Sequence, residues 1–359
     1  MINKNRFRSV KGGLLLMAVL LAGSVAFAKP TPGTLLWATS TGGAVDSSPS
    51  VEKGILYVGS DDGSLYALNA TTGQVLWLTY IGYNTGDAVD SSPVVEKDVI
   101  YVGSDDDHVY ALDAATGAIL WATVTGGDVN SSPTVVKGTL YIGSGDGSLY
   151  ALNAVTGQVL WTTYTGYHTG DAVDSSPVVE KGVLYVGSDD DHVYALDAAT
   201  GAILWETVTG GDVNSSPSVE KGILYVGSDD GGLYALNAVT GQVLWTTYTG
   251  DAVDSSPVVE KGIVYVGSDD DNVYALDAET GAILWATTTG GDVNSSPVVE
   301  KGIVYIGSDD GYVYALDAKT GAQVWRYDTG GAVNSTATID KKALFIGSTS
   351  SQVWAFFTK

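Results

Sequence analysis

A short segment recurs eight times in this chain, and one position of it always carries a side chain with an oxygen atom. This position precedes a Ser-Ser-Pro triplet or, in the last copy, Ser-Thr-Ala, and it is occupied by Asp46, Asp90, Asn130, Asp174, Asn214, Asp254, Asn294 and Asn334. Carboxylate and amide oxygens are the ligands that a hard cation such as Ca²⁺ prefers. The candidate metal ligands are therefore Asp46, Asp90, Asp174 and Asp254. The alternative is that each side chain caps its own loop.

A second group of carboxylates lies in short turns between apolar runs. These turns read SDDDH at Asp105 to His108 and at Asp189 to His192, and SDDDN at Asp269 to Asn272. Calcium loops place their ligands at alternate residues, and these turns do not. Because aspartate is a common turn former, solvated turns are the better interpretation.

Residues for catalysis are few. The chain has three histidines, His108, His168 and His192, and no cysteine, so it offers little for nucleophilic chemistry. Aspartate pairs recur in nearly every copy of the sequence, which favours turn formation over a tuned acid and base. No helix is predicted after the N-terminal segment, so no glycine-rich phosphate loop precedes one. The sequence therefore predicts no catalytic residues and no enzymatic activity.

Two loops differ from the rest by four additional residues, and both insertions contain tyrosine. Exposed aromatic side chains beside asparagine or histidine suit contact with a protein or a glycan. The alternative is that the tyrosines pack on their own loops. The candidate binding residues are Tyr80, Tyr83, Asn84, Tyr164, Tyr167 and His168.

All of these positions belong to a repeat of 40 or 44 residues that contains four short β-runs, as in a propeller blade. In one copy the runs cover residues 91–96, 99–104, 108–113 and 118–124. The eighth copy is split between the two ends of the chain. We expect an all-β fold of eight four-stranded antiparallel blades, in which a strand at 33–41 pairs with a strand at 352–357. Such closure leaves no free sheet edge at the chain ends.

Each copy ends in a tryptophan, expected to dock one blade on the next. These residues are Trp37, Trp77, Trp121, Trp161, Trp205, Trp245, Trp285 and Trp325.

The segment Ala111 to Trp121 reads ALDAATGAILW and resembles the AxDxxTGxxxW motif of pyrroloquinoline-quinone (PQQ) repeat propellers. The motif recurs at Ala195 to Trp205, Ala275 to Trp285 and Ala315 to Trp325, and with asparagine for aspartate in three further copies. In that family the tryptophan is structural. The resemblance implies one of two functional classes: quinoprotein dehydrogenases that hold PQQ and calcium, or non-enzymatic scaffolds such as the lipoprotein of the outer-membrane barrel-assembly machinery.

Quinone chemistry fits this chain poorly. The loops that a propeller places on one face contain 26 aspartates and neither lysine nor arginine, whereas the three carboxylates of PQQ require cationic donors. Beyond the N-terminal segment the only arginine is Arg326, next to a structural tryptophan. The adjacent-cysteine disulfide of the dehydrogenases is also missing. We therefore expect no bound PQQ and no cofactor, with Ca²⁺ at the aspartate ring as the alternative.

Residues 1–28 read as a secretory signal peptide, with four basic residues, an apolar run and an Ala26-Phe27-Ala28 ending. The alternative is a membrane anchor, although the run is shorter than the ~20 residues a spanning helix needs. The propeller would then comprise residues 29–359. Without a cysteine it carries no lipid anchor, so we expect a periplasmic or secreted protein that does not insert into a membrane.

The formal net charge of −24 disfavours nucleic acid as a partner and favours cationic surfaces. The sequence as a whole predicts an exported, monomeric, non-catalytic propeller that binds or scaffolds a protein, in envelope assembly for example. The alternatives are a PQQ- and calcium-dependent quinoprotein dehydrogenase and a cell-surface propeller that binds envelope glycans.

Overall fold

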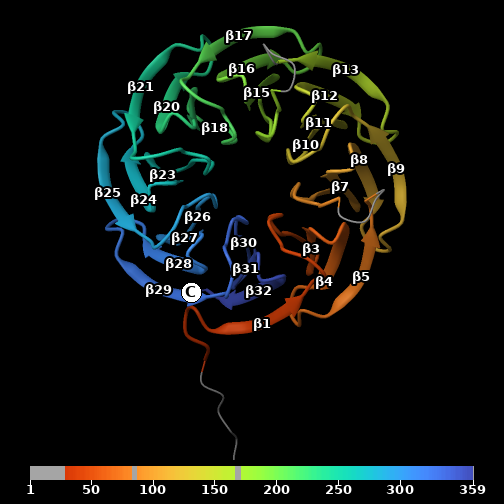
Figure 1. The fold of residues 1–359 in the computed structure, drawn as a ribbon, viewed down its shortest axis with the longest axis vertical. Helices are drawn as coiled ribbons and strands as arrows, with labels where there is room; N and C mark the ends of the chain where they lie inside the picture. The colour runs from red at the N-terminus through yellow and green to blue at the C-terminus, as the bar shows by residue number, and fades with distance from the viewer. Residues whose placement is uncertain (1–28, 83–86, 166–170, 359) are drawn as a thin grey trace, which may run out of the picture. The chain divides into compact units, whose positions relative to one another are not determined.

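The computed structural model describes residues 29–82, 87–165 and 171–358. Its compact unit, Thr31–Lys359, contains 32 strands arranged as eight four-stranded antiparallel sheets in a ring, and the centre of this ring is called here the channel (Figure 1). The predicted eight-bladed all-β propeller is confirmed. No helix capable of crossing a membrane occurs within these three ranges.

Blades are numbered here in chain order, and the strands of each blade are called A to D from the channel outward. The A strands line the channel and are only three residues long. They are β2 (Ser50–Glu52), β6 (Val94–Glu96), β10 (Thr134–Val136), β14 (Val178–Glu180), β18 (Ser218–Glu220), β22 (Val258–Glu260), β26 (Val298–Glu300) and β30 (Thr338–Asp340).

The B and C strands form the buried middle of each blade. The B strands are β3 (Ile55–Ser60), β7 (Val99–Ser104), β11 (Thr139–Gly143), β15 (Val183–Ser188), β19 (Ile223–Gly227), β23 (Ile263–Ser268), β27 (Ile303–Gly307) and β31 (Ala343–Ser348). The C strands are β4 (Ser64–Asn69), β8 (His108–Asp113), β12 (Ser148–Asn153), β16 (His192–Asp197), β20 (Gly232–Asn237), β24 (Asn272–Asp277), β28 (Tyr312–Asp317) and β32 (Gln352–Phe357).

The D strands form the outer circle in Figure 1, and each has only one strand neighbour. They are β5 (Val75–Tyr80), β9 (Ile119–Val124), β13 (Val159–Tyr164), β17 (Ile203–Val208), β21 (Val243–Tyr248), β25 (Ile283–Thr288), β29 (Gln323–Asp328) and, for blade 8, β1 (Leu35–Ser40).

The ring closes as predicted, because β1 pairs antiparallel with β32 and completes blade 8. The strand itself covers Leu35–Ser40 rather than 33–41, but hydrogen bonds extend the pairing in both directions. The amide of Gly33 donates to the carbonyl of Phe357 at 2.9 Å, and that of Thr41 donates to Ser351 at 3.0 Å.

The core consists of apolar layers between successive blades rather than one central cluster. Between blades 4 and 5, for example, Val193 and Ala195 of β16 pack against Leu224 and Val226 of β19, and all four are fully buried. Since each middle strand is covered on both sides by neighbouring sheets, its sequence is a continuous apolar run instead of an alternating one.

Candidate functional site

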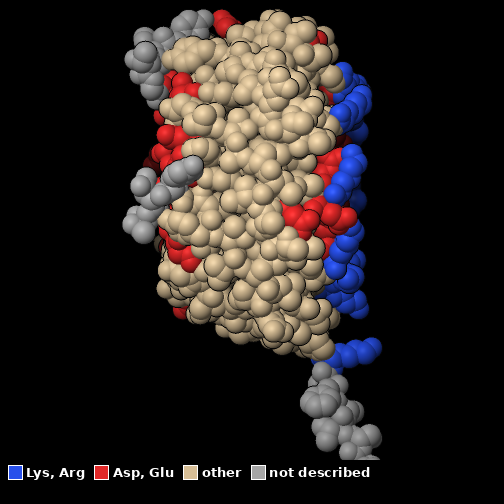
Figure 2. All heavy atoms as spheres, turned by 90° about the vertical axis from the view of Figure 1, so that its right-hand side faces the viewer, with Lys and Arg blue, Asp and Glu red and all other residues tan. Residues whose placement is uncertain are grey.

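The two faces of the ring differ in charge. The loops from strand D to the next strand A and from strand B to strand C share one face, called here the acidic face. The turns from A to B and from C to D share the other, called the lysine face. Figure 2 shows carboxylates without lysine along one side of the ring, lysines together with carboxylates along the other side, and an uncharged band between them.

Lysines of the lysine face sit at the tips of the A-to-B turns. Seven of them, in every blade but blade 3, pair with an acidic residue of the same turn, at distances from 2.5 to 3.6 Å, and their side chains are 57–83 % exposed. This face is therefore locally neutralised. The acidic face has no such compensation, because its loops contain no lysine or arginine.

The Ser-Ser pairs after the predicted ring residues hold the acidic face in register. In blade 1, the Ser47 hydroxyl donates to the carbonyl of Ser91 at 3.2 Å, and the amide of Ser48 donates to Oγ of Ser92 at 2.9 Å. The second contact repeats around the channel until the Thr336 amide donates to Oγ of Ser48 at 2.8 Å. No role was predicted for these serines, although the first of them recurs in all eight repeats and the second in seven, which was a signal.

The ring residues are half-buried at the channel mouth, and three carboxylates approach one another at one place. Asp46, Asp61 and Asp90 each offer an oxygen, and these oxygens lie within 4.8 Å of one another. Asp61 comes from the B-to-C turn of blade 1 and lies between the ring residues of blades 1 and 2. Its Oδ1, like that of Asp90, is buried without a hydrogen-bond partner.

The cluster exists because the ring sequence is irregular. Asp46 and Asp90 are the only ring aspartates on adjacent blades, since asparagine separates the others. Among the described residues, Asp174 and Asp254 belong to no group of three carboxylates. The structure thus brings two of the four predicted metal ligands together and adds Asp61, a residue that the sequence analysis did not select. The calcium site remains a prediction.

Burial and mutual repulsion raise the pKa values of these carboxyl groups. The pKa of Asp90 is raised to about 7, first by loss of solvent and then by the charges of Asp105, Asp61 and Asp46. Desolvation also raises the pKa values of Asp46 and Asp61. The effect extends around the channel, because Asp189 and Asp269 are each raised to about 7 by burial and by neighbouring aspartates.

The candidate aromatic residues that the structure describes lie at the ends of outer strands. Tyr80 ends β5 and Tyr164 ends β13, and they are 44 % and 48 % exposed. A Cβ added at Gly63 would lie 2.6 Å from the ring of Tyr80, and one at Gly147 would lie 2.8 Å from that of Tyr164. One side of each tyrosine ring therefore packs on the B-to-C turn of its own blade. Tyr83, Asn84, Tyr167 and His168 lie outside the described residues.

The tryptophans lie between blades at their outer edge. Trp205 of β17 donates through Nε1 to the carbonyl of Ala238 in blade 5 at 3.2 Å, and its ring lies 5.9 Å from that of Tyr185. A Cβ at Gly241 would lie 2.7 Å from the same indole, so only glycine allows this approach. The contact of Trp with the following Thr-Gly turn recurs at six other junctions; at the last, Gly33 approaches Trp325.

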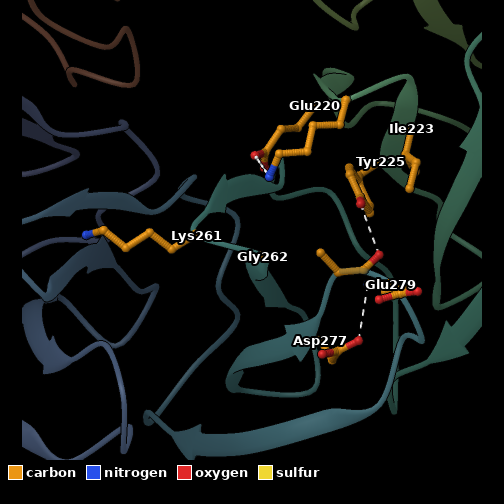
Figure 3. A pocket seen from close by; sticks show the side chains of 9 residues that line it. Glu220, Ile223, Tyr225, Lys261, Gly262, Asp277 and Glu279 are labelled. Atoms are coloured by element: carbon orange, nitrogen blue, oxygen red, sulfur yellow. Dashed lines mark hydrogen bonds and ion pairs between the residues drawn. The ribbon is translucent and has the colours of Figure 1, made fainter.

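Clefts also occur between blades on the lysine face. One of them, about 520 Å³, lies between blades 5 and 6 (Figure 3). Lys221 pairs there with Glu220 at 2.8 Å, and the hydroxyl of Tyr225 donates to the carbonyl of Ala278 at 3.0 Å. The carboxylate of Asp277 accepts the amide of Glu279 at 3.1 Å. These groups satisfy one another, and the cleft between blades 6 and 7 repeats the same three contacts.

Fold and sites together define an eight-bladed propeller with one acidic face and one face of lysine-acid pairs. A family model described as the β-propeller of the beta-alanine-activating enzyme matches residues 169–359. A second, described as outer membrane protein assembly factor BamB, matches residues 5–86 and 82–178. The chain belongs to the PQQ-like β-propeller family, as the tryptophan motif predicted.

Similar solved structures share the fold at low sequence identity. The computationally designed Ika8 protein is 19 % identical, with a TM-score of 0.79 over 90 % of this chain and 100 % of its own. BamB from Moraxella catarrhalis is 20 % identical, with a TM-score of 0.76 over 90 % and 99 %. A europium-containing methanol dehydrogenase is 16 % identical, with a TM-score of 0.77 over 90 % and 93 %. No curated protein matches the chain significantly.

Proposed function

We propose that this protein is an exported, non-catalytic propeller that binds a protein partner through its acidic face. The observation that carries this proposal is the composition of that face: burial and the repulsion between its aspartates raise their pKa values, and its loops contain no lysine or arginine to offset their charge. Such a surface attracts a cationic partner and accelerates its association. Tyr80 and Tyr164, at the border of this face, supply the exposed aromatic area that protein interfaces favour.

The alternative of a quinoprotein dehydrogenase requires a site for PQQ. Its three carboxylates would enter a region of negative potential without a cationic donor. Arg326 is held elsewhere, because its guanidinium carbon lies 4.4 Å from the ring centre of Tyr312, on the outer part of blade 7. The residues of the acidic face therefore do not fit PQQ. Because a dehydrogenase and BamB both share this fold, the fold does not decide between the two functions. The chemistry of the acidic face favours a scaffold.

The partner is tested by affinity capture from envelope extracts with the full mature chain, followed by a binding titration of the captured protein after its purification. We expect a Tyr80→Ser/Tyr164→Ser double variant to bind more weakly, and added salt to weaken the wild-type complex. The matched control is Lys221→Ser/Lys261→Ser on the lysine face, which should bind normally. The reverse pattern would place the contact on the lysine face.

Enzymatic activity and export are tested separately. The melting temperature with PQQ and Ca²⁺ should equal the melting temperature with Ca²⁺ alone. No alcohol or sugar should reduce a dye in the presence of the protein and PQQ. Substrate-dependent dye reduction would establish the dehydrogenase instead. N-terminal sequencing of the exported protein should begin at Lys29. A glycan array distinguishes the third alternative, a carbohydrate-binding propeller.

A further inference from the structure

The junction of blades 8 and 1 contains a cleft that differs from its counterparts. It lies on the lysine face, has a volume of about 330 Å³, and is lined by Leu36, Ala70, Lys341, Lys342, Ala343 and Phe345 among others. The closing strand β1 supplies Leu36, so this cleft forms only when the two ends of the chain have paired.

Three consensus residues are replaced in the A-to-B turn of blade 8 and in β31, and Phe357 of β32, which also lines the cleft, replaces a consensus aspartate or asparagine. The other seven repeats have glycine or aspartate where Lys342 stands, a β-branched residue where Ala343 stands, and tyrosine where Phe345 stands. Alanine in place of a β-branched residue removes a branched side chain from the cleft wall, and lysine in place of glycine or aspartate adds a positive charge at its mouth. In a chain of nearly identical repeats, these replacements around one cavity separate this junction from the rest.

The change from tyrosine to Phe345 frees a hydrogen-bond acceptor. At six junctions the carbonyl of the C-to-D turn alanine accepts two donors; Ala114, for example, accepts the Tyr57 hydroxyl at 3.0 Å and the Trp77 indole at 3.3 Å. The corresponding carbonyl of Ala70 accepts Trp37 at 3.1 Å, but Phe345 has no hydroxyl to give. A carbonyl oxygen has two lone pairs, so one remains available in the cleft wall.

The charges of this cleft are also distinctive. Lys341 pairs with Asp340 at 3.4 Å, whereas Lys342 has no ion-pair partner in the part of the chain that the structure describes. The cleft of Figure 3, by comparison, is lined by two lysines and three acidic residues. The junction of blades 8 and 1 therefore combines an apolar floor, an available carbonyl and a surplus of positive charge.

We propose that this cleft binds a small hydroxylated carboxylate with an apolar body. Its carboxylate pairs with Lys342 and Lys341, its apolar body contacts Phe345, Ala343 and Leu36, and its hydroxyl donates to the carbonyl of Ala70 where tyrosine does so at other junctions. The site lies on the face opposite to the proposed protein contact, and its existence is independent of that function.

The test is a calorimetric and saturation-transfer NMR titration of the full mature protein with 4-hydroxyphenylacetate. We expect one saturable site. Because a net hydrogen bond contributes about 0.5–1.5 kcal/mol, phenylacetate, which lacks the hydroxyl, should bind roughly three- to tenfold more weakly. Phe345→Tyr restores the consensus hydroxyl and should abolish binding without harming the fold, and Lys342→Ser should weaken binding about tenfold by removing a charged contact.

The repeats also allow the site to be transplanted. In the junction of blades 5 and 6, the triple variant Gly222→Lys/Ile223→Ala/Tyr225→Phe reproduces the three replacements and should raise the stoichiometry from one to two. If that variant does not fold, the Phe345→Tyr comparison still decides the matter. Absence of saturable binding at the solubility limit of 4-hydroxyphenylacetate, or equal affinity of wild type and Phe345→Tyr, would overturn the proposal.

Discussion

At the scale of single residues, the tryptophan and glycine of the repeat act across blade boundaries. The indole of Trp205 packs over a glycine turn, donates a hydrogen bond to the next blade and lies against Tyr185. Thr207 adds a second bond, from its hydroxyl to the carbonyl of Gly241 at 2.8 Å. Each motif therefore joins two sheets that share no strand pairing, and the ring depends on all of these junctions.

We expect Trp205→Ala to lower the free energy of unfolding by about 3–5 kcal/mol, because it leaves a cavity and removes one of the two hydrogen bonds to the carbonyl of Ala238. Chemical denaturation followed by far-UV circular dichroism measures the change. Leu204→Ala, at a neighbouring side chain that is 54 % exposed, is the matched control and should change stability by less than about 0.5 kcal/mol. Equal effects of the two variants would contradict the docking role.

Two glycines allow the cost of close packing to be measured separately from the cost of backbone strain. Gly201 and Gly182 have φ values of +73° and +86°, which disfavour any side chain. A Cβ at Gly201 would lie 2.6 Å from Trp161, whereas nothing lies within 4 Å of one at Gly182. Gly182→Ala should therefore cost about 1 kcal/mol and Gly201→Ala considerably more. A smaller loss for Gly201→Ala in denaturant titrations would show that the indole can move aside.

At the scale of strands and turns, the apolar runs and the turns between them predicted most strand boundaries. The boundaries of the A strands were predicted wrongly. The predicted strand 91–96 begins only at Val94, because Ser91 and Ser92 bond to the neighbouring blade rather than within their own ladder. The carboxylate cluster was only half predictable for a related reason. Asp61 joins the ring residues from another turn of the fold, a proximity that spacing along the chain does not reveal.

The closing strand is the element whose loss should matter most. Deletion of residues 33–40 from the mature protein would remove β1, uncover the edge of β32 and release the contact of Gly33 with Trp325. We expect a lower melting temperature and concentration-dependent aggregation, since an exposed strand edge pairs with other chains. Differential scanning calorimetry and light scattering measure both. Deletion of residues 29–31 should leave the melting temperature and the light scattering unchanged. An equally stable, monodisperse protein without residues 33–40 would contradict the role of β1 in closing the ring.

At the scale of the whole molecule, charge segregation makes folding sensitive to pH. The channel-side carboxyl groups have pKa values raised to about 7 for Asp90 and Asp189 and about 6 for Asp105, above the ordinary value of 3.8. Their burial and mutual repulsion favour the protonated form in the folded state. A raised carboxyl pKa means that the folded protein binds more protons than the unfolded chain, so stability falls as pH rises from about 4 through 7.

We therefore expect the melting temperature to be higher at pH 5 than at pH 8. Asp90→Asn gives blade 2 the ring residue found in four other blades and removes one repelling charge, so it should raise stability at pH 8 and flatten the pH dependence. Asp113→Asn on the lysine face is the control. Hydrogen bonds from Thr116 lower the pKa of Asp113, so its replacement should not flatten the dependence between pH 5 and 8. Calcium should substitute for protons if Asp46, Asp61 and Asp90 hold the ion. It will then raise the melting temperature of the wild-type protein at pH 8, and a chelator will reverse this increase. The increase will be larger for the wild type than for Asp90→Asn. A melting temperature that does not fall from pH 5 to pH 8 would mean that the folded protein holds no additional protons on these carboxyl groups, and the crowding of buried carboxylates on which our proposed function rests would then be wrong.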